Sequence, residues 1–271
     1  MLPPTLDRRA LLGGALAALV AARASAQTPP ASAGPADPKL IEDLVAANRV
    51  LADQGVVDGY GHVSVRHPAD PQRYLMSRSI APELVTASDV MEYDLDSNPV
   101  DARGRASYLE RFIHGEIYRA RPDVTAVVHN HSPSVIPFGV SAAPLRPLYH
   151  MSAFLGGGVP VFDIKTAAGQ ATDMLVRTPA LGRALAQTLG ARPVALMRGH
   201  GAVVVADSLP RAVFRSVYTE MNARLQAQAM ALGGPVTYLD DEEARRAEAS
   251  VGGTISRPWE LWKKKALDRK P

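Results

Sequence analysis

Apolar residues recur at helical spacing in four segments of the chain. In residues 38–54 they stay on one face until Gly55. Asp37 stands where a helix-capping residue is expected, and Pro38 takes the first helical position. Three further segments show the same period, and each ends near a proline or a glycine: 107–123, 177–190 and 209–234. The pattern predicts four amphipathic helices.

Short apolar runs between these segments are typical of strands. Five segments have this character, the last with a glycine turn in its middle: 62–66, 73–77, 91–99, 124–131 and 193–207. No repeat period appears, and no interior linker divides residues 37–250. We therefore expect one α/β domain in which strands and helices are mixed along the chain.

The first residues predict an export signal. Arg8 and Arg9 precede an apolar run over residues 10–22, and small residues follow at Ala24 and Ala26. This arrangement is typical of a twin-arginine signal peptide over residues 1–26, which implies a periplasmic protein. An uncleaved membrane anchor is the alternative, but the run is shorter than the roughly 20 residues that a span needs.

Composition divides the rest of the chain into three parts. Residues 27–37 are rich in proline, alanine and serine and predict a linker. Residues 38–235 carry the helix and strand patterns of the domain. Residues 236–271 form a charged C-terminal tail, which we expect to pack against the body or against a neighbouring subunit.

Charge and cysteine content limit the possible partners. The 271 residues have a net charge of +3, which falls to +1 when the signal with three arginines and one aspartate is removed. Basic and acidic residues are interspersed, so a nucleic-acid-binding stripe is not expected, nor is a membrane contact after signal cleavage. The chain has no cysteine, so a metal ion has to be held by histidine or carboxylate.

His129 and His131 end the apolar run of residues 124–131. Side chains at positions i and i+2 of a strand point to the same face, so both imidazoles project together. A single pair of this kind also arises by chance in a chain with seven histidines. His200 strengthens the pattern, because Gly199 and Gly201 allow the backbone to bring its imidazole close to another element. Three histidines with an open position are typical of a catalytic divalent metal site.

A carboxylate near these histidines is the next requirement. Glu110 lies one helix and one turn before His129, so it can come close to the metal. Glu116 belongs to the same predicted helix, six positions later and on a different face. A solvent-exposed surface glutamate is the alternative for either residue, and spacing alone does not choose between them.

The segment ERFIHGEIYRARPDVTAVVHNH, followed far downstream by the GHG turn, resembles the class II aldolase/adducin family over about residues 40–235. The resemblance implies a three-layer α/β/α domain with a mixed or antiparallel central sheet. It implies that His129, His131 and His200 bind a divalent metal and that Glu110 is the acid/base residue. It also implies a homotetramer, or a multiple of one, with sites at subunit interfaces. Mn²⁺ or Zn²⁺ is the leading expectation for the ion, and Fe²⁺ or Co²⁺ is possible because nitrogen ligands discriminate weakly.

Three short segments depart from the members that act on sugar phosphates. Those members bind phosphate with a GNxS turn, a TPSG-like loop and a serine pair before the catalytic glutamate. Here the same places have GHVS at 61–64, SRSIAP at 77–82 and SYL at 107–109. Most of the small phosphate donors are replaced, and the GHVSVR and MSRSIAPELV phrases are similar to a branch of the family that acts on hydroxylated aromatic acids.

The departures predict the substrate-binding residues. Arg78 is expected to clamp a planar carboxylate, and Tyr108 with Leu109 to contact a ring. An ordinary surface ion pair is the alternative for Arg78, and a hydrogen-bonded turn residue is the alternative for His62. The full set of predicted substrate contacts is His62, Ser77, Arg78, Ser79, Tyr149 and His150.

Three functions remain in competition. The first is a metal-dependent lyase that decarboxylates a hydroxylated aromatic or similarly planar acid, with Glu110 as proton donor. The second is a metal-dependent aldolase acting on a hydroxy-oxo acid or a sugar-derived substrate. The third is a non-catalytic, adducin-like interaction domain, against which the presence of His129, His131 and His200 argues.

Overall fold

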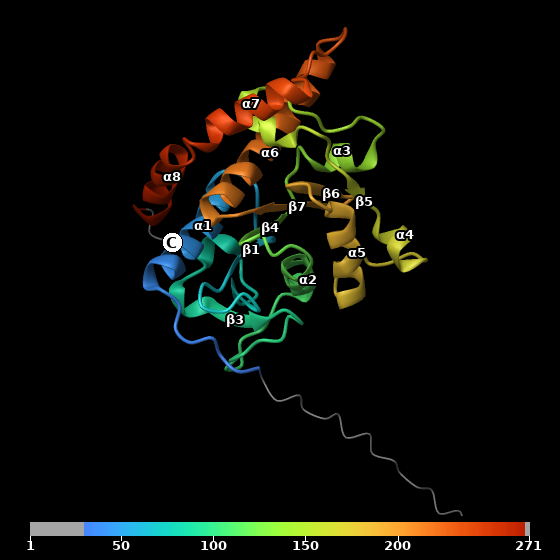
Figure 1. Cartoon of the computed structure of the whole chain (residues 1–271). Coiled ribbons are helices and arrows are strands. Elements are labelled where there is room, and N and C mark those ends of the chain that lie inside the picture. The colour runs from blue at the N-terminus through green and yellow to red at the C-terminus, as the bar shows by residue number, and fades with distance from the viewer. Residues whose placement is uncertain (1–29, 269–271) are drawn as a thin grey trace, which may run out of the picture.

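One mixed sheet of seven strands forms the centre of the molecule (Figure 1). The structure is a computed structural model and describes residues 30–268. The strand order is β3-β2-β1-β4-β7-β6-β5, and all neighbours are antiparallel except β5 and β6, which are parallel. The strands are β1 (His62–Arg66), β2 (Arg73–Ser77), β3 (Val90–Asp94), β4 (Ala126–Asn130), β5 (Val161–Phe162), β6 (Val194–Met197) and β7 (Gly201–Ala206).

Helices cover both faces of this sheet. The α-helices are α1 (Pro38–Asp53), α2 (Phe112–Ala120), α3 (Ile136–Val140), α4 (Ile164–Ala168), α5 (Pro179–Leu189), α6 (Leu209–Ala231), α7 (Asp241–Gly252) and α8 (Ser256–Asp268). The 3₁₀ turns are η1 (Pro82–Leu84), η2 (Ala87–Asp89), η3 (Leu109–Arg111) and η4 (His150–Leu155). Figure 1 shows α1 and α6 on one side of the strands and α2 and α5 on the other. The predicted three-layer α/β/α architecture with a mixed sheet is confirmed.

Each sheet face has its own hydrophobic core. Along β4, Ala126 and Val128 belong to the core under α1 and α6, whereas Val127 belongs to the core under α2 and α5. Because side chains alternate along a strand, His129 shares the face of Val127 and points towards the α2 side. The buried strand therefore fixes the direction of His129 by packing apolar side chains on both faces.

The predicted helices and strands are present, with differences at their ends. The strand expected over residues 91–99 ends at Asp94, and α3, α4 and β5 were not predicted. Asp37 caps α1 by accepting a hydrogen bond from the Lys39 amide at 2.9 Å. The helix expected over residues 107–123 begins only at Phe112, and the η3 turn precedes it. Glu110 in that turn has φ −92° and ψ 16°, outside the helical region, so it lies in a kink rather than on the helix face.

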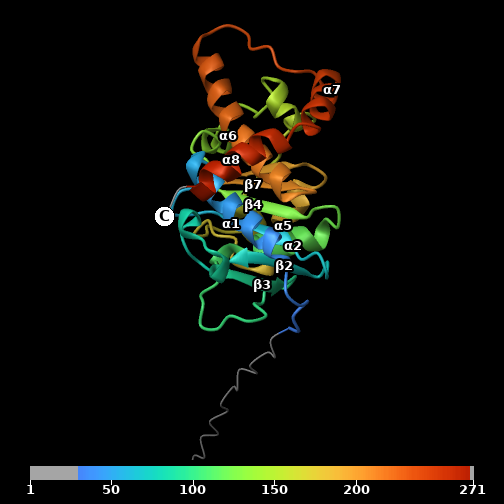
Figure 2. The same cartoon turned by 90° about the vertical axis from the view of Figure 1, so that its left-hand side faces the viewer.

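The charged C-terminal tail packs against the body of the same chain (Figure 2). Helix α7 contacts η4, and α8 contacts α1 and α6. Trp259 is buried in the core beneath α1 and α6, and the Lys263 ammonium lies 2.6 Å from Glu42 and 2.7 Å from Asp43. Apolar burial and paired charges thus hold α8 against α1.

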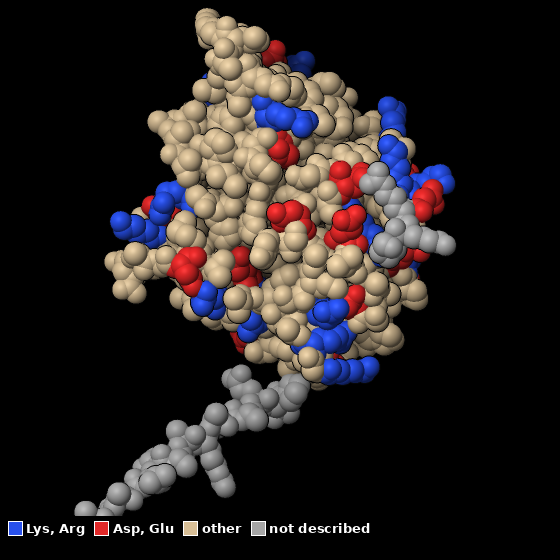
Figure 3. Space-filling model, turned by 180° about the vertical axis from the view of Figure 1, so that it is seen from behind, with Lys and Arg blue, Asp and Glu red and all other residues tan. Residues whose placement is uncertain are grey.

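The described residues cover only part of the segments predicted at the N-terminus. The predicted signal peptide over residues 1–26 lies outside the described residues. In the second half of the linker, Ser32 and Ala33 both donate hydrogen bonds to the Glu92 carboxylate. Within residues 30–268, no helix combines the length and the apolar character that a membrane crossing requires. On the face shown in Figure 3, basic and acidic side chains are interspersed.

Candidate metal centre

Four side chains from three separate parts of the chain converge on one point. Glu110, His129, His131 and His200 each offer one ligand atom, and these atoms lie within 4.8 Å of one another. The Nε2 atom of His131 lies 3.2 Å from Nε2 of His129 and 3.0 Å from Nε2 of His200. Glu110 Oε2 lies 3.4 Å from Nε2 of both His129 and His200. The structure thus brings together the four residues predicted as metal ligands and acid/base residue.

Backbone carbonyls fix the orientation of two of the imidazoles. His129 Nδ1 lies 3.2 Å from the Ala202 carbonyl oxygen, and His200 Nδ1 lies 2.9 Å from the Met174 carbonyl oxygen. A carbonyl only accepts, so each Nδ1 carries the hydrogen, and in the neutral ring Nε2 is left with a lone pair. These lone pairs face one another across the cluster, which is the arrangement of histidines that bind a metal.

Glycines bring His200 into this cluster. Gly199 adopts φ +65°, a left-handed conformation in which glycine carries no steric cost. A Cβ atom on Gly201 would lie 2.0 Å from the Asn130 carbonyl oxygen, so only glycine allows β7 to approach the end of β4 so closely. The GHG turn therefore places the third imidazole beside the two from β4.

Glu110 is held by η3 and by one backbone amide. Its side chain is buried, and Oε1 accepts a hydrogen bond from the Val176 amide at 2.9 Å, which leaves Oε2 facing the histidines. Burial raises the pKa of Glu110, but the charge of His129 and hydrogen bonds with His129 and His200 outweigh it and hold the pKa well below its usual range. Glu110 is therefore a carboxylate at neutral pH.

The same surroundings also change the pKa values of the imidazoles. Burial, together with His129 and His200, lowers the pKa of His131 to about 4. Burial also lowers the pKa of His200, but its hydrogen bond with Glu110 and the charge of that carboxylate more than offset this and raise it. Glu110 therefore favours a positive charge at this point, either a proton on Nε2 of His200 or a metal ion that takes its place, and His131 keeps a free lone pair.

This donor set fits a divalent transition metal. Three imidazole nitrogens and one carboxylate oxygen are ligands that zinc and its neighbours accept, and three such nitrogens leave room for a substrate oxygen. The separations of 3.0 and 3.2 Å between the nitrogens are close to the value for a tetrahedral shell. In such a shell, bonds of about 2.0–2.1 Å put neighbouring ligands roughly 3.3 Å apart. The residues present can therefore hold such an ion.

A cavity of about 300 Å³ opens beside the cluster. Its wall combines apolar, aromatic and a few polar groups. The lining residues are Gly59, Tyr60, Gly61, His62, Ser79, Ile80, Ala81, Tyr108, Leu109, Glu110, His131 and Leu175. Of the predicted substrate contacts, His62 and Ser79 are in this wall, as are Tyr108 and Leu109, which were expected to contact a ring.

Ser77 and Arg78 are next to the cavity without lining it. Ser77 is buried, and its hydroxyl oxygen lies 3.2 Å from the Tyr108 hydroxyl oxygen. Arg78 Nε donates to Asp89 Oδ1 at 2.6 Å, so the guanidinium is tied to η2. Ser77 thus orients Tyr108, and the clamp role of Arg78 stays a prediction.

Tyr149 and His150 lie in another part of the chain. His150 begins η4 and lines a second cavity, of about 410 Å³, between η4, α6 and α7. The Tyr149 ring packs against Tyr218 of α6 at a centroid distance of 6.4 Å. Within a single chain these two residues are not brought to the metal cluster.

Glu116 also lies away from the cluster. It is buried on α2 and forms ion pairs with Arg119 at 3.8 Å and Arg183 at 3.7 Å. Glu110 and Glu116 thus differ in their surroundings, and only Glu110 meets the histidines.

The loop before α5 contributes contacts that the sequence analysis missed. Met174 supplies the carbonyl oxygen for His200, Val176 supplies the amide for Glu110, and Leu175 lines the cavity. Tyr60 lines the cavity between two glycines, and it is 71% exposed. The glycine pair around Tyr60 is the only one of these features with a signal in the sequence.

Comparisons with known proteins find one family and several relatives. The family described as Class II Aldolase and Adducin N-terminal domain matches residues 42–227. Decarboxylase tropJ of Talaromyces stipitatus is 37% identical over 244 residues, covering 82% of this chain and 92% of that protein. The 3,4-dihydroxyphthalate decarboxylase of Arthrobacter keyseri is 33% identical over 230 residues, covering 79% and 88%.

The solved structures support the same fold. L-fuculose 1-phosphate aldolase from Glaciozyma antarctica PI12 superposes with a TM-score of 0.71 at 23% identity, covering 88% of this chain and 94% of that one. The family match spans most of the chain, and both relatives cover more than two thirds of it. This protein belongs to the class II aldolase/adducin family.

Proposed function

We propose that this protein is a divalent-metal-dependent lyase that decarboxylates a hydroxylated aromatic or similarly planar carboxylic acid. The observation that carries the proposal is the convergence of three imidazole nitrogens and the Glu110 carboxylate at one end of a cavity with aromatic and apolar walls. The two decarboxylase relatives, one of which acts on a dihydroxyphthalate, support the substrate class.

The cavity walls favour a planar ring over a sugar phosphate. Tyr108, Leu109, Ile80 and Leu175 offer flat or apolar surface. The Tyr108 hydroxyl donates to the Ile80 carbonyl oxygen at 2.6 Å, so this ring is fixed in the wall. A planar aromatic acid buries its faces against such groups and keeps its oxygens for the metal end.

Glu110 is positioned to move one proton. As a carboxylate it takes the proton of the substrate hydroxyl when the acid binds, and it returns that proton to the ring carbon from which CO₂ leaves. A divalent ion held by the histidines supplies a Lewis acid that stabilises the negative charge developing on the substrate. Ile80, Leu109 and Leu175 offer apolar surface to the reacting part of the substrate.

The aldolase reaction remains the second candidate. Glu110 lies close enough to the cluster to abstract a proton next to a carbonyl, so the same residues serve carbon–carbon cleavage. The converging ligands weigh against a purely structural, adducin-like role.

One incubation separates these reactions. Metal-loaded protein is mixed with hydroxylated aromatic carboxylates and, separately, with sugar phosphates, and the release of CO₂ and of aldehyde is followed. CO₂ release from an aromatic acid supports the proposal. Turnover of a sugar phosphate without CO₂ would reject it.

The proposal also covers the metal ion, the oligomeric state and the location of the protein. We propose Mn²⁺ or Zn²⁺ as the ion, with Fe²⁺ or Co²⁺ possible, a homotetramer or a multiple of one, and a periplasmic location reached by the twin-arginine route. Replacing Arg8 and Arg9 by lysine should leave precursor in the cytoplasm, which cell fractionation measures. Unchanged export of that variant would exclude the route.

A further inference from the structure

A chain of four buried polar groups runs from the cavity wall into the core. His62 Nδ1 lies 2.6 Å from His114 Nε2, and His114 Nδ1 lies 2.6 Å from the Ser64 hydroxyl oxygen. The Ser64 oxygen lies 2.8 Å from the Tyr118 hydroxyl oxygen. All four side chains are at most 3% exposed. Neither His114 nor Tyr118 contacts the metal cluster, so the metal chemistry does not account for them.

The fold places these groups in line. His62 and Ser64 are two residues apart on β1 and share one face, and His114 and Tyr118 are four apart on α2 and share another. Helix α2 covers the face of the sheet to which His129 points. The four groups thus meet between β1 and α2, directly behind the cavity wall.

Tyr118 determines the direction of the hydrogen bonds. Its hydroxyl hydrogen has two possible acceptors, the Ser64 oxygen at 2.8 Å and the Thr125 carbonyl oxygen at 3.5 Å. The Thr125 oxygen already accepts the Arg66 amide at 2.7 Å. The shorter contact to Ser64 is therefore the stronger bond, and the Tyr118 hydroxyl donates to Ser64.

Each following bond then has only one arrangement. Ser64 donates to Nδ1 of His114, so His114 carries its hydrogen on Nε2 and donates to Nδ1 of His62. Nδ1 of His114 accepts from Ser64, and Nδ1 of His62 accepts from His114, so each ring holds a single hydrogen. In His62 that hydrogen is on Nε2.

Nε2 of His62 has no hydrogen-bond partner in the described part of the chain, although the residue lines the cavity. His62 is the direct cross-strand neighbour of His129, and their ring centroids are 5.0 Å apart. Nε2 of His62 is not among the buried atoms that lack a partner, so it is open to the cavity. A ligand that displaces water from this atom has to supply an acceptor in its place.

We infer that His62 donates its Nε2 hydrogen to a carboxylate oxygen of the substrate, and that Tyr118, Ser64 and His114 are positioning residues that hold His62 in the donating tautomer. The identity of the acceptor rests on the proposed function, whereas the tautomer does not. This series of hydrogen bonds provides a substrate-binding donor that does not depend on Arg78.

Nitrogen NMR tests the tautomer without substrate or activity. Metal-free protein with ¹⁵N-labelled histidine is recorded, and the His62 and His114 signals are assigned by their loss in His62→Gln and His114→Gln. A hydrogen on Nε2 of both rings supports the inference. A hydrogen on Nδ1 of His62 would overturn it.

Two tyrosine variants test the positioning role. Tyr118→Phe removes the directing hydroxyl, and the His62 signals should shift towards a mixture of tautomers. Tyr74→Phe is the matched control, because the Tyr74 hydroxyl is equally buried but bonds Ser97 and the Arg111 carbonyl. Unchanged His62 signals in Tyr118→Phe would show that Tyr118 does not set the direction.

Calorimetric titration with 3,4-dihydroxyphthalate tests the contact itself. In zinc-loaded protein, His62→Phe should weaken binding at least about tenfold, as expected for a hydrogen bond to a charged oxygen, and His62→Gln should recover most of it. Tyr118→Phe should weaken binding about twofold if both tautomers become equally populated. Equal affinity of wild type and His62→Phe would reject the contact.

The failure of this inference differs from the failure of the proposed function. If wild-type protein does not bind the dihydroxyphthalate while His62 carries its hydrogen on Nε2, the substrate class is wrong and the donor stands. If it binds and releases CO₂ but His62 carries its hydrogen on Nδ1, the function stands and the donor is wrong.

Discussion

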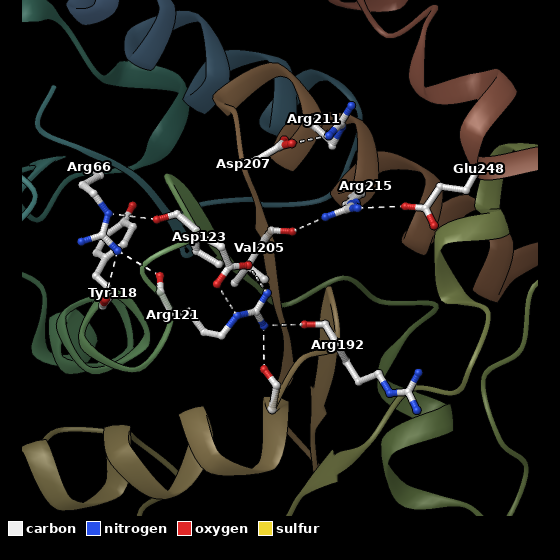
Figure 4. Close-up of polar contacts among 12 residues, drawn as sticks. Arg66, Tyr118, Arg121, Asp123, Arg192, Val205, Asp207, Arg211, Arg215 and Glu248 are labelled. Carbon is white, nitrogen blue, oxygen red and sulfur yellow. Dashed lines mark hydrogen bonds and ion pairs between the residues drawn. The ribbon is translucent and has the colours of Figure 1, made fainter. Parts of the chain in front are cut away.

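The two ends of the central strands both gather polar and charged side chains, but the contacts that these side chains make differ between the ends. At the end opposite the metal cluster, Arg66 donates to the carbonyl oxygens of Val124 and Tyr118, and Arg215 donates to the Val205 carbonyl and to Glu248 (Figure 4). Both of these guanidinium groups bond to other groups of the chain. We call this region the arginine end.

At the metal end, by contrast, the polar atoms of several side chains face one another. His129 and His200 use their Nδ1 hydrogens on backbone carbonyls, and their Nε2 atoms face His131 and Glu110. Lone pairs that face one another need a cation between them. The difference indicates that charges at the arginine end stabilise the fold, whereas those at the metal end are arranged for a ligand. Changes at the metal end should therefore affect activity, and changes at the arginine end should affect stability.

The largest expected effect is the loss of turnover in Glu110→Gln. This variant keeps the shape of the side chain but removes the group that moves the proton, so turnover should fall on the order of a hundredfold or more. Steady-state kinetics with an aromatic acid measures it. Glu116→Gln is the matched control, and an equal loss there would mean that proximity to the histidines is not what matters.

The next effect is stabilisation by the metal. Binding to the folded chain alone should raise the free energy of unfolding by about 2.7 kcal/mol at a hundredfold excess over Kd. Urea unfolding with zinc and with a chelator gives this difference. The gain should disappear in His200→Asn, and a full gain in that variant would place the ion elsewhere.

At the arginine end we expect a smaller loss of stability and no change in metal content. Arg215→Met leaves the Val205 carbonyl and the Glu248 carboxylate without their donor, which costs about 1–3 kcal/mol. Arg211→Met is the control, because Arg211 pairs with Asp207 on the surface, and such pairs contribute about 0–1 kcal/mol. Equal losses in the two variants would contradict the distinction between them.

The smallest effect, counted per pH unit, is the acid sensitivity that His114 confers. Its pKa is lowered to about 3 by burial, so the unfolded chain takes up a proton that the folded chain refuses. This contribution is complete above the ordinary histidine pKa of about 6.5 and is lost as the pH falls from there. The free energy of unfolding should fall by at most about 1.4 kcal/mol per pH unit from this residue. In chelator-treated protein, His114→Gln should flatten the urea-derived slope, and an unchanged slope would reject the assignment.

Much of the fold was predictable because the spacing of apolar residues along the sequence matches the faces that are buried in the structure. The run over residues 124–131 is apolar on both faces, so it predicts a central strand, and β4 is flanked on both sides in the sheet. The same period predicts that His129 and His131 project together. The glycines around His200 predict its close approach to another element. The structure explains why glycine is needed, because a Cβ atom on Gly201 would lie 2.0 Å from the Asn130 carbonyl oxygen.

Other parts of the site were not predictable for physical reasons. The Val176 amide and the Met174 carbonyl position Glu110 and His200, and backbone groups carry no signal in residue type. The kink that carries Glu110 lies inside a segment with helical period. Arg78 has a carboxylate 11 residues later, at Asp89, whose proximity depends on how the η2 turn folds back.

The measurement that tests the central claim most directly is the metal content of purified protein and of its His129→Ala variant. Elemental analysis of the wild type, after dialysis against limiting Mn²⁺ or Zn²⁺, should give one divalent ion per chain. The His129→Ala variant should give almost none, and Tyr74→Phe, which alters the same core away from the cluster, should keep the full amount. Undiminished metal in His129→Ala would contradict the account, because the converging imidazoles would then not be the site that holds the ion.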